Sequence, residues 1–159
     1  MQTRIRPAAI EDAALICGFI RELAEYERLL GQCMATPEAL AAALFAPAPR
    51  VFCEIAEGDG AAAGFALWFY SYSTFQAKHG IYLEDLYVQP QFRGHGLGKA
   101  LIVDLARRAS REGCGRFEWS VLDWNEPSIA FYKSLGAKEI NDWTAFRLEG
   151  EALREVAAE

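Results

Sequence analysis

The sequence predicts a single α/β domain, and three observations support this. Segments that alternate polar and apolar residues take turns with segments of helical periodicity along the 159 residues. The composition is 52% hydrophobic and 24% charged, which is typical of a folded chain with a core. A strand-like run at 81–88 also passes through a glycine-rich turn into a helix-like run from Leu97. We therefore expect residues 1–159 to form one domain.

The first part of the chain predicts one strand and two helices. Thr3–Pro7 alternates before a proline and predicts a short strand. The spacing of apolar residues from about Glu11 to Leu30 predicts a long helix that ends at Gly31. Thr36-Pro37-Glu38 is typical of an N-cap followed by proline, and it predicts a second helix to about Phe45.

The middle of the chain predicts a hairpin and the strand before the glycine turn. Val51–Glu57 and Ala63–Tyr72 are two strands joined by Gly58-Asp59-Gly60, and the second is rich in aromatic residues that we assign mainly to the core. Ile81–Val88 is the next strand. In a regular strand Asp85 would share a face with Ile81, Leu83 and Tyr87, and Glu84 would lie on the other face. A carboxylate in the apolar strand 81–88 needs a partner or a function, because burying a charge is costly.

The remaining segments alternate between helix and strand. The predicted elements are a helix at 97–112, a strand at 116–121, a helix from Glu126 that Gly136 ends, strands at 137–140 and 144–148, and a tail at 149–159 that forms a last helical turn or frays.

The charge distribution separates the whole chain from one local region. Sixteen basic and twenty-two acidic residues give a net charge of -6, which argues against general nucleic-acid binding. Basic side chains nevertheless gather in and after the glycine turn, where an anion would approach. They are Arg93, Lys99, Arg107, Arg108, Arg111 and Arg116.

Cysteine and histidine spacing predicts no metal site. The four cysteines show no C-x-x-C pattern and the two histidines stand apart. Reduced thiols fit a cytoplasmic protein. The N-terminus lacks the apolar core of a signal peptide, and no apolar run approaches the roughly 18 residues of a transmembrane helix, so we expect no membrane association.

The run Arg93-Gly94-His95-Gly96-Leu97-Gly98 predicts an anion site. Glycines let the backbone approach a ligand, and the first N–H groups of the following helix have no intrahelical partner. The spacing does not fit G-x-G-x-x-G, and Ala100 stands where a P-loop needs Ser or Thr. A turn that only connects a strand to a helix is the alternative for bare glycines.

The same run resembles the R/Q-x-x-G-x-G/A motif of the GNAT acetyltransferase superfamily. Ile20–Glu27, Tyr82–Asp85 and Trp124–Ala137 further resemble its diamine and polyamine N-acetyltransferase branch, which includes enzymes acting on thialysine. The resemblance implies the GNAT fold, a central mixed twisted sheet flanked by helices. It also implies acetyl-CoA as cosubstrate, a small amine substrate, and a homodimer with the C-terminal strands near its interface.

The resemblance implies two groups of cofactor-binding residues. Backbone groups of the strand end pair with the pantetheine arm and polarise the acetyl carbonyl, and the glycine loop binds the pyrophosphate mainly through N–H groups. His95 is given no catalytic role. The residues are Leu86, Tyr87, Val88, Arg93, Gly94, Gly96, Gly98 and Lys99, together with Asn125 and Tyr132.

Two residues carry the implied chemistry. Tyr132 matches the general acid near the cofactor sulfur, and Glu84 matches a general base that acts through water. The alternative for Tyr132 is a core aromatic of its short helix, and the alternative for Glu84 is a salt-bridged structural carboxylate.

Acids and an aromatic residue are implied for the amine. These are Glu25, Tyr26, Glu27 and Asp85, although a solvated helix face is the alternative for the helical acids. Ser73-Thr74-Phe75 replaces a tryptophan that relatives often carry, so the length of the accepted amine stays open. Two alternative functions remain: acetylation of a protein amine or an aminoglycoside, and a non-catalytic CoA-binding sensor.

Overall fold

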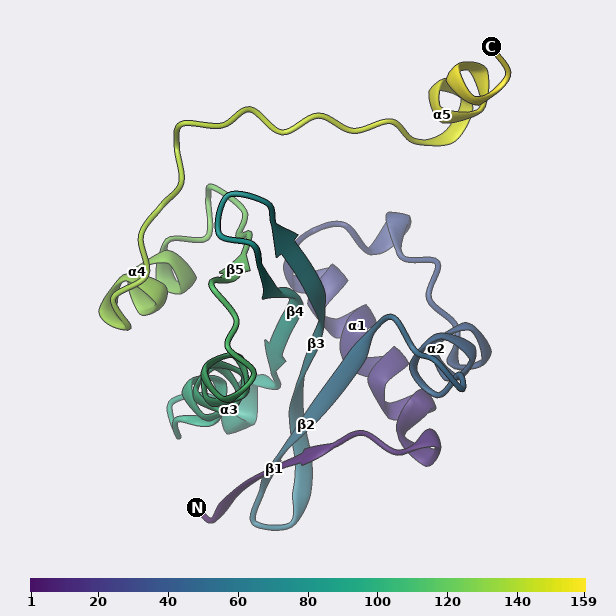
Figure 1. Cartoon of the computed structure of the whole chain (residues 1–159). Helices are drawn as coiled ribbons and strands as arrows, with labels where there is room; N and C mark the ends of the chain where they lie inside the picture. Colours follow the sequence, from purple (N-terminus) through teal and green to yellow (C-terminus); the bar gives the residue numbers. More distant parts are fainter. The chain divides into compact units, whose positions relative to one another are not determined.

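A computed structural model describes all residues from Met1 to Glu159. The chain forms two compact units, Met1–Ser120 and Val121–Glu159, which are described separately. The larger unit is a five-stranded sheet in the order β1-β2-β3-β4-β5, with α1 and α2 on one face and α3 on the other (Figure 1). The first three strand pairs are antiparallel and β4–β5 is parallel, so the predicted α/β fold with a mixed sheet is confirmed.

Most elements lie where the sequence predicts them. The strands are β1 (Thr3–Pro7), β2 (Phe52–Gly58), β3 (Ala61–Ser73), β4 (Lys78–Val88) and β5 (Phe117–Trp119). The helices of this unit are α1 (Ala13–Tyr26), α2 (Pro37–Leu44) and α3 (Leu97–Arg111), with short 3-10 turns at Ile10–Asp12, Leu30–Gln32 and Pro90–Phe92.

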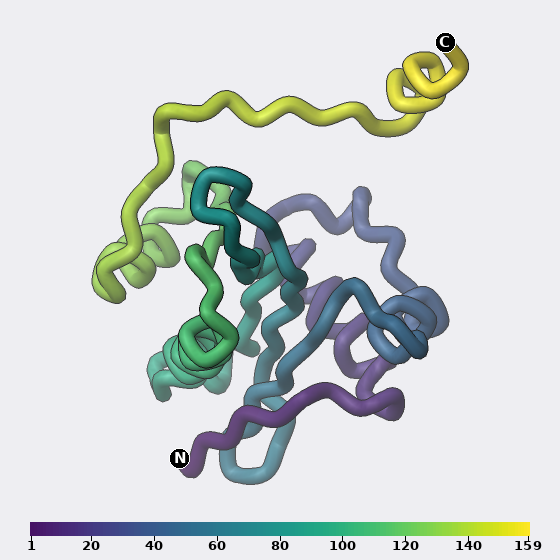
Figure 2. Tube along the Cα trace, in the orientation of Figure 1, coloured from purple at the N-terminus to yellow at the C-terminus, as the bar shows by residue number.

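Local sequence signals account for the hairpin and the second helix. Asp59 and Gly60 take positive φ values of 51° and 82°, as the tight turn between β2 and β3 requires. This turn and the β3–β4 connection lie at opposite ends of the sheet (Figure 2). The Thr36 hydroxyl accepts a hydrogen bond from the Ala39 N–H at 3.2 Å, which confirms the predicted N-cap.

Helix α1 ends at Tyr26, earlier than the predicted end near Leu30. Arg28 has a left-handed φ of 63°, which stops the helical path. The Leu29 N–H then donates to the Ala24 carbonyl at 2.8 Å, so the backbone closes the helix without the expected glycine.

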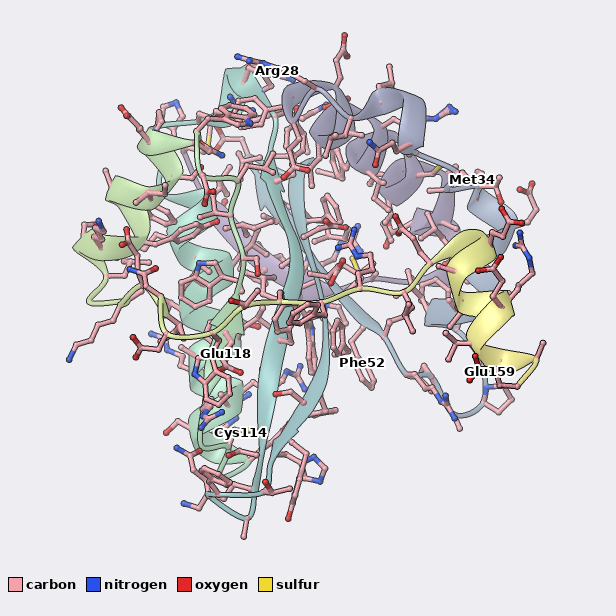
Figure 3. All side chains as sticks on the ribbon, turned by 90° about the horizontal axis from the view of Figure 1, so that it is seen from above. Arg28, Met34, Phe52, Cys114, Glu118 and Glu159 are labelled. Carbon is pink, nitrogen blue, oxygen red and sulfur yellow. The ribbon has the colours of Figure 1, made fainter.

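The core of the larger unit has a layer on each face of the sheet. On the α1 face, Phe19 stacks on Phe65 with ring centres 5.9 Å apart, and Tyr87 packs beside them. On the other face, α3 buries Leu101 and Leu105 completely. Figure 3 shows side chains filling the space between the sheet and the helices on both of its faces. Burial on both faces makes the sheet a rigid support for the residues at its edge.

The smaller unit differs from prediction. It contains α4 (Glu126–Ser134) and α5 (Gly150–Ala157), and α5 is a regular helix where only a helical turn or a frayed tail was expected. The strands predicted at 137–140 and 144–148 are wrong, because these residues belong to no strand. A strand needs a hydrogen-bonded neighbour, and alternation in the sequence does not supply one.

None of the helices combines the length and apolar character that crossing a membrane requires. No group of three or more His, Cys, Asp and Glu side chains is arranged to hold a metal ion.

Candidate functional site

Strand β4 has an open edge over its last residues. It pairs with β3 as far as Val88, but it pairs with β5 only at Ile81, Tyr82 and Leu83. The segment from Glu84 to Val88 therefore has no strand on its β5 side. Unpaired backbone groups of this kind are available to an extended ligand. The predicted pantetheine-binding residues Leu86, Tyr87 and Val88 all lie in this segment.

A β-bulge lies where this open edge begins. Leu67 of β3 pairs with Asp85, but the next residue, Trp68, pairs with Leu83, so Glu84 has no partner of its own on β3. A bulge of this kind bends the strand and aims side chains in a new direction.

The bulge changes the face on which the strand residues lie. Leu83 shares a face with its partner Trp68, whose ring lies 5.1 Å from the guanidinium of Arg108 in α3. Asp85 shares a face with Leu67, which belongs to the core cluster under α1. The predicted alternation, with Leu83 and Asp85 on one face, is therefore wrong, because it assumed a regular strand.

Three carboxylates interact around this bulge. Asp85 is half-buried, and burial together with the nearby charges of Glu84 and Glu27 raises the pKa of Asp85 to about 7. Glu27 follows the last residue of α1, and burial also raises its pKa. Glu84 is exposed beside them. The arrangement concentrates negative charge that a cation would neutralise.

The other predicted amine-binding residues lie on the last turn of α1. Glu25 and Tyr26 are exposed there, immediately before Glu27. The charge of Glu27 therefore acts on Asp85, whereas Glu25 does not contribute to the raised pKa of Asp85.

The glycine loop has the geometry of an anion site. Gly94 and Gly96 have positive φ values of 78° and 83°, which residues other than glycine rarely adopt. Gly96 is the N-cap of α3 and supplies no side-chain cap, while the first helical hydrogen bond runs from the Ala100 N–H to the Gly96 carbonyl at 2.9 Å. The earlier N–H groups at Leu97 to Lys99 are therefore available to an anion.

Arg93 does not point its side chain at an empty anion site. Its Nε donates to the Val88 carbonyl at 2.8 Å, and its guanidinium lies 5.2 Å from the centre of the Tyr26 ring and 5.6 Å from that of Tyr87. One carbonyl of the predicted pantetheine-binding segment is thus already bonded within the protein.

A second contact with α1 was not predicted from the sequence. The Gln89 side-chain amide donates to both carboxylate oxygens of Glu22, at 3.1 and 3.2 Å. Glu22 is one of several acids in α1, and no local sequence pattern pairs it with Gln89, which lies 67 positions further along the chain. This contact holds α1 against the residue that follows β4.

Asn125 and Tyr132 lie on α4 in the smaller unit. Asn125 is buried, and its side-chain oxygen accepts from the Ser128 N–H at 3.4 Å as the N-cap of α4. Tyr132 is half-buried, with its ring centre 5.3 Å from that of Phe131. The cap gives Asn125 a structural role, and its predicted role beside the cofactor stays a prediction.

A groove lies between β1 and α3. A space of about 520 Å³ is bounded by Thr3 and Ile5 of β1 and by Lys99 and Arg107 of α3. Gly96 also lines this groove, so it adjoins the glycine loop and the start of α3, where the pyrophosphate is predicted to bind.

Comparison with known proteins identifies the family. Residues 16–137 match the Acetyltransferase (GNAT) family. The chain belongs to the GNAT acetyltransferase family. This confirms the resemblance seen in the glycine loop.

Relatives of this GNAT chain carry specific names. It is 42% identical to the thialysine N-epsilon-acetyltransferase of Mus musculus, over 98% of this chain and 97% of that protein. It is 31% identical to the L-ornithine N5-acetyltransferase NATA1 of Arabidopsis thaliana, over 98% of this chain and 88% of that protein. Among solved structures, an integron cassette protein from the mobile metagenome of V. cholerae superposes with a TM-score of 0.83 at 28% identity, covering 100% of this chain and 99% of that one.

Proposed function

We propose that this chain transfers the acetyl group of acetyl-CoA to a primary amine of a small cationic substrate by direct attack. The substrate is a diamine, a polyamine or a lysine-like amine. Family membership supports the acetyl transfer. The names of the relatives support the amine, because thialysine and ornithine both carry a primary amine at the end of a short side chain.

The observation that carries the proposal is the carboxylate cluster at the bulge of β4. Asp85 is half-buried beside Glu84 and Glu27, and none of the ion pairs in the larger unit includes any of the three. Buried negative charge without a partner is costly, and a bound ammonium group removes that cost. Asp85 and Glu27, with Glu25 and Tyr26 on the same turn of α1, are the proposed amine-binding residues.

The proposed reaction needs a base and an acid. An alkylammonium group with a pKa near ~10.4 must lose a proton before its nitrogen can attack. Glu84, exposed at the bulge, accepts this proton through a water molecule. The nitrogen then bonds to the thioester carbon, the carbon–sulfur bond breaks, and the Tyr132 hydroxyl protonates the departing thiolate. The second proton of the nitrogen passes through water to the Tyr132 phenolate, which leaves a neutral amide, the CoA thiol and a regenerated tyrosine.

Acetyl-CoA binding uses mainly backbone groups. The unpaired edge at Leu86, Tyr87 and Val88 pairs with the pantetheine arm, and a backbone N–H there polarises the acetyl carbonyl. The pyrophosphate occupies the loop and the start of α3, where positive φ values and uncapped N–H groups support an anion site. The loop residues are Arg93, Gly94, Gly96, Gly98 and Lys99, and Asn125 lies beside the cofactor in this proposal.

The test is an acetylation assay with purified protein. Acetyl-CoA is incubated with putrescine, spermidine, spermine, thialysine, ornithine or lysine, and free thiol and acetylated product are measured together. We expect thiol release that matches product formation for at least one amine. Failure of every amine to release thiol would reject the proposal. An aminoglycoside and an N-terminal peptide belong in the same panel, and binding of CoA without any turnover would identify a sensor.

Steady-state kinetics of two variants distinguish the proposed roles of Glu84 and Asp85. Glu84→Gln should lower kcat with little change in the KM for the amine, because it removes the proton acceptor. Asp85→Asn should mainly raise that KM, because it removes a charge that binds the ammonium group. The opposite pattern would exchange the two roles.

Three properties of the whole protein belong to the same proposal. We propose that residues 1–159 act as one catalytic domain, that the enzyme is a cytoplasmic homodimer, and that it needs no metal. Limited proteolysis, light scattering after gel filtration, cell fractionation and assays with a chelator test these points in turn. A protease-stable fragment without α4, or a monomer at the assay concentration, would contradict them.

A further inference from the structure

Arg93 touches both parts of the proposed active site. Its Nε is hydrogen-bonded to the Val88 carbonyl at 2.8 Å, at the end of the strand proposed to bind pantetheine. Its guanidinium lies 5.2 Å from the centre of the Tyr26 ring, on the turn of α1 proposed to bind the amine. The Tyr87 ring centre is 5.6 Å away on another side. A single side chain therefore joins the two regions.

The neighbouring contacts hold this arrangement in place. Gln89 is bonded to Glu22 of α1 at 3.1 and 3.2 Å, so α1 and the end of β4 are already fixed to each other. Burial and a hydrogen bond with Glu22 raise the pKa of Tyr87, which keeps its hydroxyl protonated. Arg93 thus packs against a support that does not depend on Arg93 itself.

The loop that follows Arg93 is the part that a ligand would order. Gly94 follows Arg93 directly and Gly96 comes two residues later. Both are exposed and have positive φ values. Cation–π contacts at exposed positions are weak, so the contact of Arg93 with the Tyr26 ring is held only loosely by its own energy. An anion bound to the loop N–H groups would restrict the backbone at Gly94, the residue next to Arg93.

We propose that Arg93 is a positioning residue that couples the binding of the two substrates. Acetyl-CoA on the glycine loop holds Arg93 against Tyr26, which orders the last turn of α1 and tightens the binding of the amine there. Linkage requires that the amine tightens acetyl-CoA binding by the same factor. This inference rests on the proposed function, because it takes the loop and the end of α1 as the two binding regions.

The experiment measures this coupling by titration calorimetry. The amine that reacts fastest in the acetylation panel is titrated into the enzyme alone and into the enzyme saturated with CoA, which lacks the acetyl group and cannot react. For the unmodified chain we expect CoA to tighten amine binding by about 5- to 20-fold, within the usual range of coupling between sites. For Arg93→Met the ratio should fall to roughly 1–2, because the variant has neither the cation nor the Nε donor.

Two further variants separate positioning from a general structural effect. Arg93→Lys keeps a charge over the rings and should restore part of the ratio. Arg21→Met removes an exposed arginine from α1 and is the control for lost charge, so its ratio should match that of the unmodified chain. Tyr26→Leu removes the ring but leaves the hydrogen bond to Val88 possible, and it should lower the ratio as Arg93→Met does.

The outcomes distinguish the inference from the function beneath it. An unmodified enzyme that acetylates an amine but shows a ratio near one overturns the inference alone. The same holds if folded Arg93→Met, checked by thermal melting, weakens both substrates and leaves the ratio unchanged. Absence of turnover with every amine counts against the proposed function. If Arg93→Met does not fold, Tyr26→Leu and Arg93→Lys decide between the outcomes.

Discussion

Asp85 lies opposite Leu67 across strands β4 and β3, so its carboxylate stands on the face of the sheet that α1 covers. The residue before it, Glu84, has no partner on β3, because the register shifts there. Asp85 and Tyr87 alternate regularly on the α1 face, and the shift places Leu83 on the α3 face. Glu84, at the point where the strand changes face, and Glu27 both act on the charge of Asp85.

The raised pKa of Asp85 predicts a specific dependence of stability on pH. An unfolded Asp ionises near pH ~3.9, whereas burial, Glu84 and Glu27 raise the pKa of folded Asp85 to about 7. Between these values the folded protein binds more protons than the unfolded chain, so this group lowers stability as pH rises from about 4 to 7.

Asp85→Asn should remove that loss and stabilise the free enzyme by on the order of 2–4 kcal/mol above pH 7. Urea unfolding of both proteins from pH 4 to 8 measures the effect, because other groups cancel in the difference. The gain should grow through this window and then level off. A gain that does not change with pH would show that the charge of Asp85 is not responsible. Glu84→Gln should shift the window to lower pH, since it removes a like charge beside Asp85.

Removing the Tyr132 hydroxyl tests the proposed general acid. Tyr132→Phe should lower kcat by roughly 100- to 10,000-fold and leave the affinity for CoA nearly unchanged, because proton donation matters only when the thiolate departs. Tyr70→Phe is the matched control. It removes a hydroxyl that is bonded to Glu112 at 2.6 Å outside the site, and its kcat should match that of the unmodified enzyme. An unchanged rate in Tyr132→Phe would leave Tyr132 as a packing residue of α4.

The absence of a side chain at Gly64 allows β3 to approach β4 closely. A Cβ atom at this position would meet the Tyr87 carbonyl and lie 3.0 Å from the Val88 Cα, and both contacts are with backbone atoms that cannot rotate away. Gly64→Ala should therefore destabilise the protein by about 1–3 kcal/mol and weaken CoA binding, because it displaces the strand end that binds pantetheine.

Gly18→Ala is the control for Gly64→Ala. Nothing lies within 4 Å of a Cβ at Gly18, which is inside α1, and the change should stabilise the protein by about 0.5–1 kcal/mol. Thermal melting and CoA titration measure both variants. Equal CoA affinity in the two variants would mean that the strand spacing at Gly64 does not control the open edge.

The ion pair between buried Glu54 and half-buried Arg108 predicts a large effect on stability. Glu54 is 4% exposed, and its carboxylate accepts a hydrogen bond from Arg108 at 3.3 Å. Arg108→Met leaves this carboxylate without its cation and should cost about 3–5 kcal/mol. The double change Glu54→Met with Arg108→Met should recover much of that loss, since no unpaired charge remains. Denaturant unfolding gives both values, and a double variant as unstable as Arg108→Met would show that packing of the arginine matters more than its charge.

Features that depend on a few neighbouring residues could be predicted. The N-cap at Thr36, the turn at Asp59-Gly60 and the start of α3 at Leu97 follow from local backbone preferences. The end of α1 was predicted too late, because Gly31 seemed the natural stop and the left-handed conformation of Arg28 has no clear local signal. The strands expected after Gly136 are absent, since alternation alone does not create a neighbouring strand.

Local sequence patterns predicted the α/β class, the order of most elements, the glycine loop and its resemblance to the acetyltransferases, because each of these depends on neighbouring residues. Packing of the whole chain was needed to show that the register shifts at Glu84, that Asp85 approaches Glu27, and that Arg93 lies against Tyr26. These relations join residues that are distant in the chain. Register, burial and the fields of distant charges arise only when the elements pack, so no local pattern contains them.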